Sequence, residues 1–574
     1  MRGCFTAPAR LAFQQHWLTG GREKQTARHA DQAVVWFAQG PGDTHLKKLF
    51  ASVAVFLAAA CQGESPSVAV DPNDFSRLVA EPQTLTAIAA DIAAKRTTSA
   101  AVVQAFLDRI AAVDDAGPML NAVLAINPNA LADAKALDAL LAEGIVKGPL
   151  HGVPILLKDN IDTADPMPTT AGSLALQLNI TGRDAPLVER LRAAGAVILG
   201  KTNLSEWANF RSGSSTSGWS AVGGQTRNPH VLDRNPCGSS AGSGAAMAAG
   251  LAAATIGTET DGSIVCPSSA NGIVGLKPTV GLVPRTHIVP ISTTQDTAGP
   301  MVLSVADAAL LLSVIAGSDP SDAATAEADA RKQDYVAALD AGALAGKRIG
   351  VARFEAGYHT ATDAAFAEAL EVLKEAGAIL VEIDAFGGDT RAMGAAEFTV
   401  LLAEFRAGLD AYLATTPAAV KARTLADLIA FNAATPAELE FFGQDTFEQA
   451  AKAPLLTDRA YLDAKATAAR LAGPEGIDRL LAANNVVALV APTGGPAWPT
   501  DPVTGDHFLG SSSGLAAVSG YPHITVPMGE VRDLPVGLSF FGAKWSEATL
   551  LGLAYAYEQK SQARAAPEFF RTLP

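Results

Sequence analysis

Short apolar runs alternate with helix-length segments over most of the chain. Runs with the length of buried strands lie at 152–157, 196–199, 348–352, 379–383, 488–491 and 524–526. Segments with helical periodicity lie at 84–113, 130–142, 187–194, 244–253, 305–316 and 363–376. Short buried strands that alternate with helices need cover on both faces of their sheet. The pattern predicts an α/β fold, a single large domain with a mixed, mostly parallel central sheet covered by helices on both faces.

The domain organisation is predicted from where this alternation starts. Residues 1–45 lack it and are predicted to be a non-native upstream extension, followed by an export signal at 46–61 and a Ser/Pro/Gly-rich linker at 62–79. No linker divides residues 80–574. We therefore expect one folded domain there, with a helical elaboration around 330–475.

The predicted export signal has three parts. Lys47 and Lys48 precede the apolar run Leu49–Ala60, whose last three residues are alanines, and Cys61 follows. The run is shorter than the about 20 residues that span a bilayer. Its end resembles a bacterial lipobox, with alanine where leucine is usual. We expect initiation at Leu46 and export, either to the periplasm or as a lipoprotein anchored through Cys61. The alternatives are a core helix and a cytoplasmic protein.

Composition excludes several functional classes. The formal net charge of −15 argues against a broad nucleic-acid-binding face. Four cysteines in 574 residues do not predict a disulfide framework. The sequence has no CxxC, HExxH or P-loop pattern, so no metal and no cofactor is predicted. A monomer without a nucleic-acid partner is expected.

Two Gly/Ser turns flank an apolar helix between residues 235 and 278. The first is Gly238–Gly244 and the second is Thr260–Ser263. Glycines beside a serine let backbone N–H groups converge, as an oxyanion hole requires. A phosphate-binding helix N-terminus or a simple tight turn would have the same composition.

Lys158 ends the apolar run Val153–Leu157, so its side chain is expected to enter the interior. Burial penalises the charged form of a lysine and lowers its pKa, which is about 10.4 in water. A lysine whose pKa falls far enough can act as a base near pH 7. The structural alternative is an ion pair with Asp159 or Asp162.

Other residues near these motifs have less specific roles. Cys237 and Cys266 flank the two turns and are expected to pack as small hydrophobes. Trp207 and Phe210 are predicted to line a substrate pocket, with the core as their alternative location.

Several motifs together resemble the amidase signature family. They are PLHGVPILLKDNID at 149–162, KTNLSEWANFR at 201–211, GWSAVGGQTRNP at 218–229, TETDGSIVCP at 258–267, GLKPT at 275–279 and AYAYEQ at 554–559. The 24-residue spacing of Ser239 and Ser263 agrees with the family's pair of serines. Most members have glycine at the position of Asp261, whereas the TDGS motif here is similar to that of bacterial peptide amidases.

The resemblance implies the amidase signature fold and a Lys-Ser-Ser triad. Ser263 would be the nucleophile, Ser239 would bridge from a cis peptide bond, and Lys158 would be the base. The oxyanion would be held by backbone N–H groups of Thr260, Asp261, Gly262 and Ser263. We add the hypothesis that the Asp261 carboxylate binds a substrate N–H or the leaving amide; its alternative role is to cap the turn.

The predicted function is a serine amidohydrolase that converts carboxamides to acid and ammonia, with C-terminal amides of peptides as substrates. Three alternatives remain open. One is a broad amidase for aryl or fatty amides. A second is the glutamine-hydrolysing subunit of an aminoacyl-tRNA amidotransferase, and a third is a non-catalytic scaffold.

Overall fold

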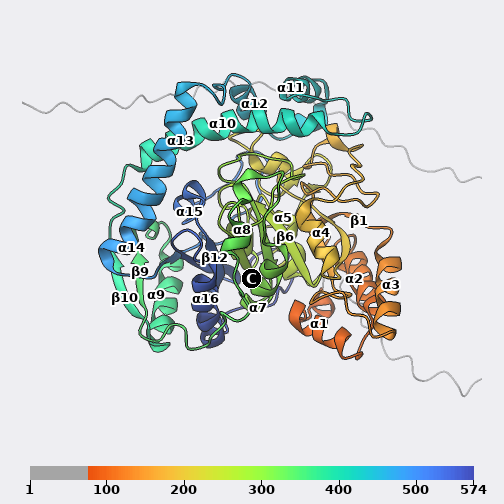
Figure 1. Cartoon of the computed structure of the whole chain (residues 1–574), viewed down its shortest axis with the longest axis horizontal. Helices are drawn as coiled ribbons and strands as arrows, with labels where there is room; N and C mark the ends of the chain where they lie inside the picture. Colours follow the sequence, from red (N-terminus) through yellow and green to blue (C-terminus); the bar gives the residue numbers. More distant parts are fainter. Residues whose placement is uncertain (1–74) are drawn as a thin grey trace, which may run out of the picture. The chain divides into compact units, whose positions relative to one another are not determined.

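Among residues 75–574, the part that the computed structural model describes, eleven strands pair in one sheet (Figure 1). In pairing order they are β1 (Val123–Ile126), β3 (Val197–Thr202), β2 (Pro154–Lys158), β6 (Ala254–Glu259), β8 (Thr297–Val302), β7 (Val274–Lys277), β12 (His523–Val531), β13 (Leu534–Phe541), β11 (Ala488–Pro492), β9 (Arg348–Ala352) and β10 (Ile379–Ile383). A separate hairpin joins β4 (Trp219–Ser220) and β5 (Gly224–Gln225). The predicted extension, export signal and most of the linker lie outside the described residues.

The sheet is mixed, as predicted, but the expected predominance of parallel pairs is not found. In the described part of the chain, four of its pairings are parallel and six are antiparallel. The antiparallel pairs lie mainly in the middle of the sheet. There β12 and β13 are joined by Arg532 and Asp533, both with positive φ, a turn that forces neighbouring strands to run antiparallel.

Helices cover both faces of the sheet, which confirms the prediction. Side chains alternate along each strand, so Ile155 and Leu157 enter one core while Leu156 enters another. The first core is covered by α1 (Leu85–Ala93), α4 (Pro186–Ala193), α7 (Val305–Ile315), α9 (Thr360–Glu375) and α16 (Glu547–Ser561). The opposite face packs against α2 (Ser99–Val113), α3 (Ala130–Ala142), α5 (Ala241–Ala248), α6 (Val265–Ala270) and α15 (Gly514–Ser519).

The helical elaboration is narrower than the predicted 330–475, because β9, α9 and β10 within that range belong to the sheet layers. Its helices are α10 (Thr390–Ala414), α11 (Leu425–Ala434) and α12 (Asp445–Ala450), drawn along the upper edge of Figure 1, and α13 (Arg459–Ala472), drawn at its upper left. The short α8 (Ala328–Arg331) and α14 (Arg479–Asn484) complete the α-helices of the described residues.

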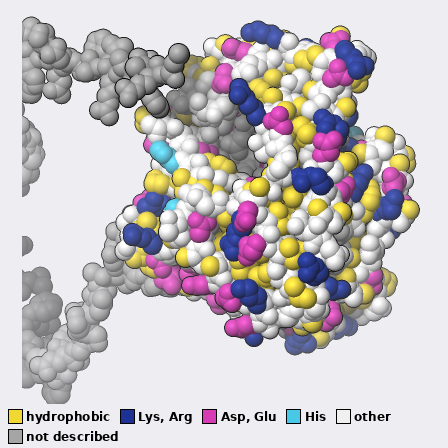
Figure 2. Space-filling model, turned by 90° about the vertical axis from the view of Figure 1, so that its left-hand side faces the viewer, with side chains coloured by type: hydrophobic (Ala, Val, Ile, Leu, Met, Phe, Trp, Pro, Cys, Tyr) yellow, Lys and Arg dark blue, Asp and Glu magenta, His cyan; other side chains and the backbone are white. Residues whose placement is uncertain are grey.

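Residues 75–574 belong to one compact unit. Within the described range, every helix is too short or too polar to cross a bilayer. On the face drawn in Figure 2, acidic and basic side chains are interspersed, so this face gathers no basic patch.

Candidate active site

Lys158 is the last residue of β2, which lies between β3 and β6. Its side chain is fully buried, and Nζ donates hydrogen bonds to Ser239 Oγ at 2.7 Å, to Thr258 Oγ1 at 2.9 Å and to Thr258 O at 3.1 Å. Burial lowers the pKa of Lys158 to about 7, although the negative charges of Asp296 and Glu259 act in the opposite direction. At neutral pH this amine is therefore partly uncharged.

The alternative role of Lys158, an ion pair with Asp159 or Asp162, is not observed. Asp159 accepts hydrogen bonds from Thr170 and lies 3.7 Å from Lys201 Nζ. Asp162 accepts from Arg183 at 2.9 Å and from the hydroxyl of Tyr412 at 2.8 Å. Both carboxylates interact with other partners, and Lys158 forms its hydrogen bonds with Ser239 and Thr258 instead.

Ser239 lies in the turn before α5, and the peptide bond between Gly238 and Ser239 is cis. The side chain is buried beside Lys158 Nζ. On its other side the backbone is held by Ser205, whose N–H donates to Ser239 O at 3.0 Å. The turn thus holds the Ser239 hydroxyl against the amine.

Ser263 follows β6 at the end of the second turn. The backbone N–H of Ser240 donates to Ser263 O at 3.2 Å, which joins the two turns. Within residues 75–574 the Ser263 hydroxyl makes no hydrogen bond, and it faces a cavity. A buried hydroxyl that is free on one side and close to a lysine–serine pair has the environment of an activated nucleophile.

The turn leading to Ser263 offers unpaired backbone donors. In the described residues the N–H groups of Thr260, Asp261, Gly262 and Ser263, the predicted oxyanion hole, have no hydrogen-bond partner. Gly262 has φ +77°, a conformation in which successive N–H groups can converge on one anion. Glu259 holds the following residues, because its Oε2 accepts from Ile264 N at 2.7 Å and from Val265 N at 3.0 Å.

The cavity in front of Ser263 has a volume of about 740 Å³. Its walls come from the two turns, from residues 208–217 and from residues 498–514, and they include Phe210, Cys237, Asp261, Trp498 and Phe508. Trp207 does not line this cavity: it is 2% exposed and packs edge-on against Phe447 in the core. Trp207 thus occupies its alternative location, the core, while Phe210 lines the cavity.

The Asp261 side chain is exposed in the cavity, although protein surrounds it on the remaining sides. Burial raises its pKa, against the effects of a hydrogen bond from Ser513 and of Lys277. The Ser513 hydroxyl donates to Oδ1 at 2.5 Å. One carboxylate oxygen thus fixes the loop around Ser513, and the other is able to accept a hydrogen bond.

Cys237 and Cys266 form a disulfide, which the sequence did not lead us to expect. They lie 29 residues apart, with Cα atoms separated by 6.0 Å, and both line the cavity. Cysteine spacing alone gave no signal, because the turns that bring them together are defined only in the fold.

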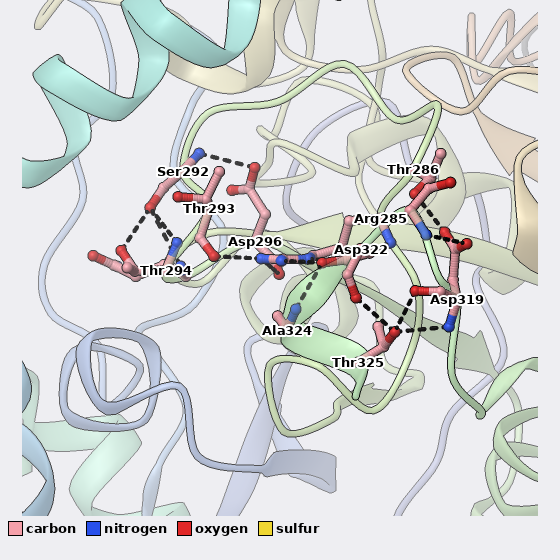
Figure 3. Close-up of polar contacts among 12 residues, drawn as sticks. Arg285, Thr286, Ser292, Thr293, Thr294, Asp296, Asp319, Asp322, Ala324 and Thr325 are labelled. Atoms are coloured by element: carbon pink, nitrogen blue, oxygen red, sulfur yellow. Dashed lines mark hydrogen bonds and ion pairs between the residues drawn. The ribbon is translucent and has the colours of Figure 1, made fainter. Parts of the chain in front are cut away.

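A second cavity, of about 500 Å³, lies beside the Lys158 pair. Its lining includes Asn160, Thr258, Thr260, Asp296 and residues 285–293. Figure 3 shows how its wall is fixed: Arg285 donates to both oxygens of Asp322, at 2.8 and 2.7 Å, and Ser292 N donates to Asp296 Oδ2 at 2.9 Å.

Asp296 and Thr258 are site residues that the sequence motifs did not reveal. Asp296 Oδ1 accepts a hydrogen bond from the Thr260 hydroxyl at 2.6 Å, and its charge acts on Lys158. Thr258 supplies two acceptors to the lysine amine. Thr258 could have been found from its place two residues before Thr260, whereas Asp296 carries no sequence signal because only the loop geometry brings it here.

Comparison with known proteins places this site in a family. The amidase family model matches residues 101–551. A probable amidase of Arabidopsis thaliana is 39% identical over 496 residues, which cover 83% of this chain and 89% of that protein. A glutamyl-tRNA(Gln) amidotransferase subunit of Chloroflexus aurantiacus is 35% identical over 501 residues, or 83% and 96% of the two chains.

Among solved structures, native peptide amidase from Stenotrophomonas maltophilia is 52% identical, with a TM-score of 0.80 over 85% of this chain and 98% of that one. The family match, the mixed sheet and the sequence identity over most of both chains all indicate the same family. The chain belongs to the amidase (amidase signature) family and is an amide hydrolase.

Proposed function

We propose that this amidase hydrolyses the C-terminal carboxamide of peptides to a carboxylate and ammonia, using Lys158, Ser239 and Ser263. One observation carries the proposal: a fully buried lysine with a pKa of about 7 is hydrogen-bonded to Ser239, and Ser263 lines the neighbouring cavity. A buried cation is costly, so its retention beside two serines favours a catalytic role.

In the first step neutral Lys158 takes a proton from Ser239, and Ser239 takes one from Ser263. Ser263 Oγ attacks the carboxamide carbon, and the unpaired N–H groups of residues 260–263 bind the oxyanion. Each such donor contributes about 3–4 kcal/mol to transition-state stabilisation in comparable hydrolases. The two Thr258 oxygens stabilise the ammonium that forms on Lys158.

In the second step the C–N bond breaks. Lys158 returns the proton through Ser239 to the departing nitrogen, so ammonia leaves and Ser263 carries the acyl group. Water then attacks the acyl-enzyme with the same proton path in use, and the carboxylic acid is released. Both steps use only groups of the chain and a water molecule.

The substrate assignment rests on similarity and on cavity size. The peptide amidase compared above is 52% identical to this chain, whereas the amidotransferase subunit is 35% identical. A bacterial aryl acylamidase is 23% identical, which supports the shared fold alone. A cavity of about 740 Å³ is large enough for a short peptide end.

A substrate panel tests the proposal. We expect ammonia release from amidated dipeptides with internal peptide bonds intact, and less than about one hundredth of that rate with glutamine, aryl amides or fatty amides. Ammonia would be measured enzymatically, beside a Ser263→Ala control. Release only from aryl or fatty amides would discard the peptide assignment, and release only from glutamine would favour the amidotransferase role.

Asp261 is expected to contribute to binding of the peptide amide. Asp261→Asn should lower kcat/KM on amidated dipeptides by about 10-fold, because the carboxylate then no longer accepts a charge-assisted hydrogen bond from the substrate. Steady-state kinetics on an amidated dipeptide and on the matching peptide methyl ester measure this. Full activity of the variant on the amide would leave Asp261 with the turn-capping role alone.

A further inference from the structure

The Cys237–Cys266 disulfide links the two turns that carry the serines of the site. Cys237 precedes Ser239 by two residues, and Cys266 follows Ser263 by three. Both cysteines line the cavity in front of Ser263. The bond therefore joins the two serine-bearing turns covalently at the place where their hydroxyl groups must meet.

Hydrogen bonds of Ser240 also join these turns, because its Oγ donates to Thr258 O at 3.0 Å and accepts from Thr258 N at 3.2 Å. Ser240 N donates to Ser263 O at 3.2 Å, and Asn271 Nδ2 donates to Pro236 O at 2.9 Å. Ser239 is held on its far side by Lys158. The Ser263 hydroxyl makes no hydrogen bond in the described part of the chain, so only the backbone of its turn sets its position.

Proton transfer between the two hydroxyl groups depends steeply on that position. A misplacement of about 1 Å in a reacting group can lower a rate by about 100-fold. An element that ties the backbone on both sides of the relay is therefore expected to change the rate more than the binding of substrate, which involves the whole wall of the cavity.

We propose that the Cys237–Cys266 disulfide is a positioning element that keeps Ser263 aligned with Ser239, so that the oxidised protein is the active amidase and the reduced protein is folded but slow. The inference rests on the proposed function of these serines. Reduction breaks the S–S bond, adds two electrons and two protons to give two thiols, and converts one dithiol reductant to its disulfide. Export, predicted from residues 46–61, would keep the bond oxidised.

A disulfide that only stabilised the fold would respond differently to reduction. An apolar cluster with Val231, Ala270, Trp498 and Leu534 packs around the two cysteines, so we expect the chain to stay folded after reduction. If the bond served stability alone, its loss would lower Tm and leave the rate unchanged at temperatures well below Tm.

The test compares the full chain before and after reduction by dithiothreitol at 15 °C, with far-UV circular dichroism to confirm that it stays folded. We expect kcat on an amidated dipeptide to fall at least about 10-fold while KM changes less than about 3-fold. Labelling of Ser263 by a small sulfonyl fluoride should slow in parallel, and reoxidation should restore both rates.

Two variants serve as controls. Cys237→Ser/Cys266→Ser should be slow and insensitive to dithiothreitol, whereas Cys4→Ser/Cys61→Ser should respond as the unmodified chain does. Thiol titration will confirm that the disulfide has been reduced. If the rate is then unchanged, or if the chain unfolds on reduction, the proposal is overturned. Absence of amidase activity in the oxidised chain would instead refute the proposed function, so the two failures are distinguishable.

Discussion

Replacement of Lys158 by methionine is expected to lower kcat/KM for amide hydrolysis by about 10²–10⁴-fold in a protein that stays folded. Methionine has a similar length and fills the same buried space, but it cannot take the proton from Ser239. Steady-state kinetics on an amidated dipeptide measure the loss. Activity within 3-fold of the unmodified enzyme would exclude Lys158 as the base.

The pH profile follows from the same lysine. In the proposed mechanism the uncharged amine of Lys158 is the base. Because the pKa of Lys158 is about 7, kcat/KM should rise with pH through about 7 and then level off. Asp296 raises that pKa through its negative charge. Asp296→Asn should therefore move the rising limb to lower pH, and a profile that stays flat between pH 5 and 9 would contradict the assignment.

Lys158 should also reduce the stability of the fold. Its pKa falls from 10.5 to about 7 on folding, so the unfolded chain binds a proton that the folded chain releases. Stability is therefore lowered by about 5 kcal/mol at or below pH 7, and this penalty fades as the pH rises towards 10.5. The Lys158→Met variant is free of this penalty, which raises its free energy of unfolding. Its Ser239 and Thr258 acceptors lose their hydrogen bonds, and each loss offsets about 1–3 kcal/mol of that increase.

Lys158→Met should thus be at least as stable as the unmodified chain at pH 6, with a smaller advantage at pH 9.5. Urea unfolding at the two pH values measures the difference. Lys201→Met is the matched comparison, because it removes a buried lysine that lies 3.7 Å from Asp159, and its loss should destabilise the fold. A Lys158→Met variant less stable at both pH values to the same extent would refute this link between the lysine pKa and stability.

Ser263→Ala is expected to have the largest effect on activity, a loss on the order of 10⁶-fold, as is found when serine hydrolases lose their nucleophile. The backbone donors and the cavity remain, so substrate should still bind with an unchanged dissociation constant. Ser268→Ala is the matched control: this serine is fully buried near Ser263, outside the cavity, and its removal should leave kcat within 2-fold. Equal losses in both variants would point to general disruption of the loop.

Local features of the fold could be predicted where the sequence carries a strong periodic signal. The strands at 348–352 and 379–383 and the helix at 130–142 have the predicted bounds, because apolar runs define them locally. The pairing direction could not be predicted, since β7, β8 and β12 are brought together by long-range packing. The helix predicted at 244–253 ends at Ala248, because Gly250 adopts φ +68° and turns the chain towards β6.

The same division holds for the site. Lys158, Ser239 and Ser263 carry motif signals, and the structure brings the first two within hydrogen-bond distance. The disulfide and Asp296 carry none, because their partners are distant in sequence and are chosen by loop geometry. The aromatic pair separates for a local reason: Trp207 has φ +49° and turns into the core, while Phe210 remains at the cavity wall.

The most direct test of the proposed mechanism is to identify the residue that carries the acyl group during turnover. The oxidised chain would be mixed with an amidated dipeptide, quenched in acid within milliseconds, digested and mapped by mass spectrometry. We predict the mass of the dipeptide acyl group on Ser263, its absence in Ser263→Ala, and its decay in step with release of the acid. An acyl group on another residue, or ammonia release at full rate with no acylated chain at any time, would contradict the mechanism.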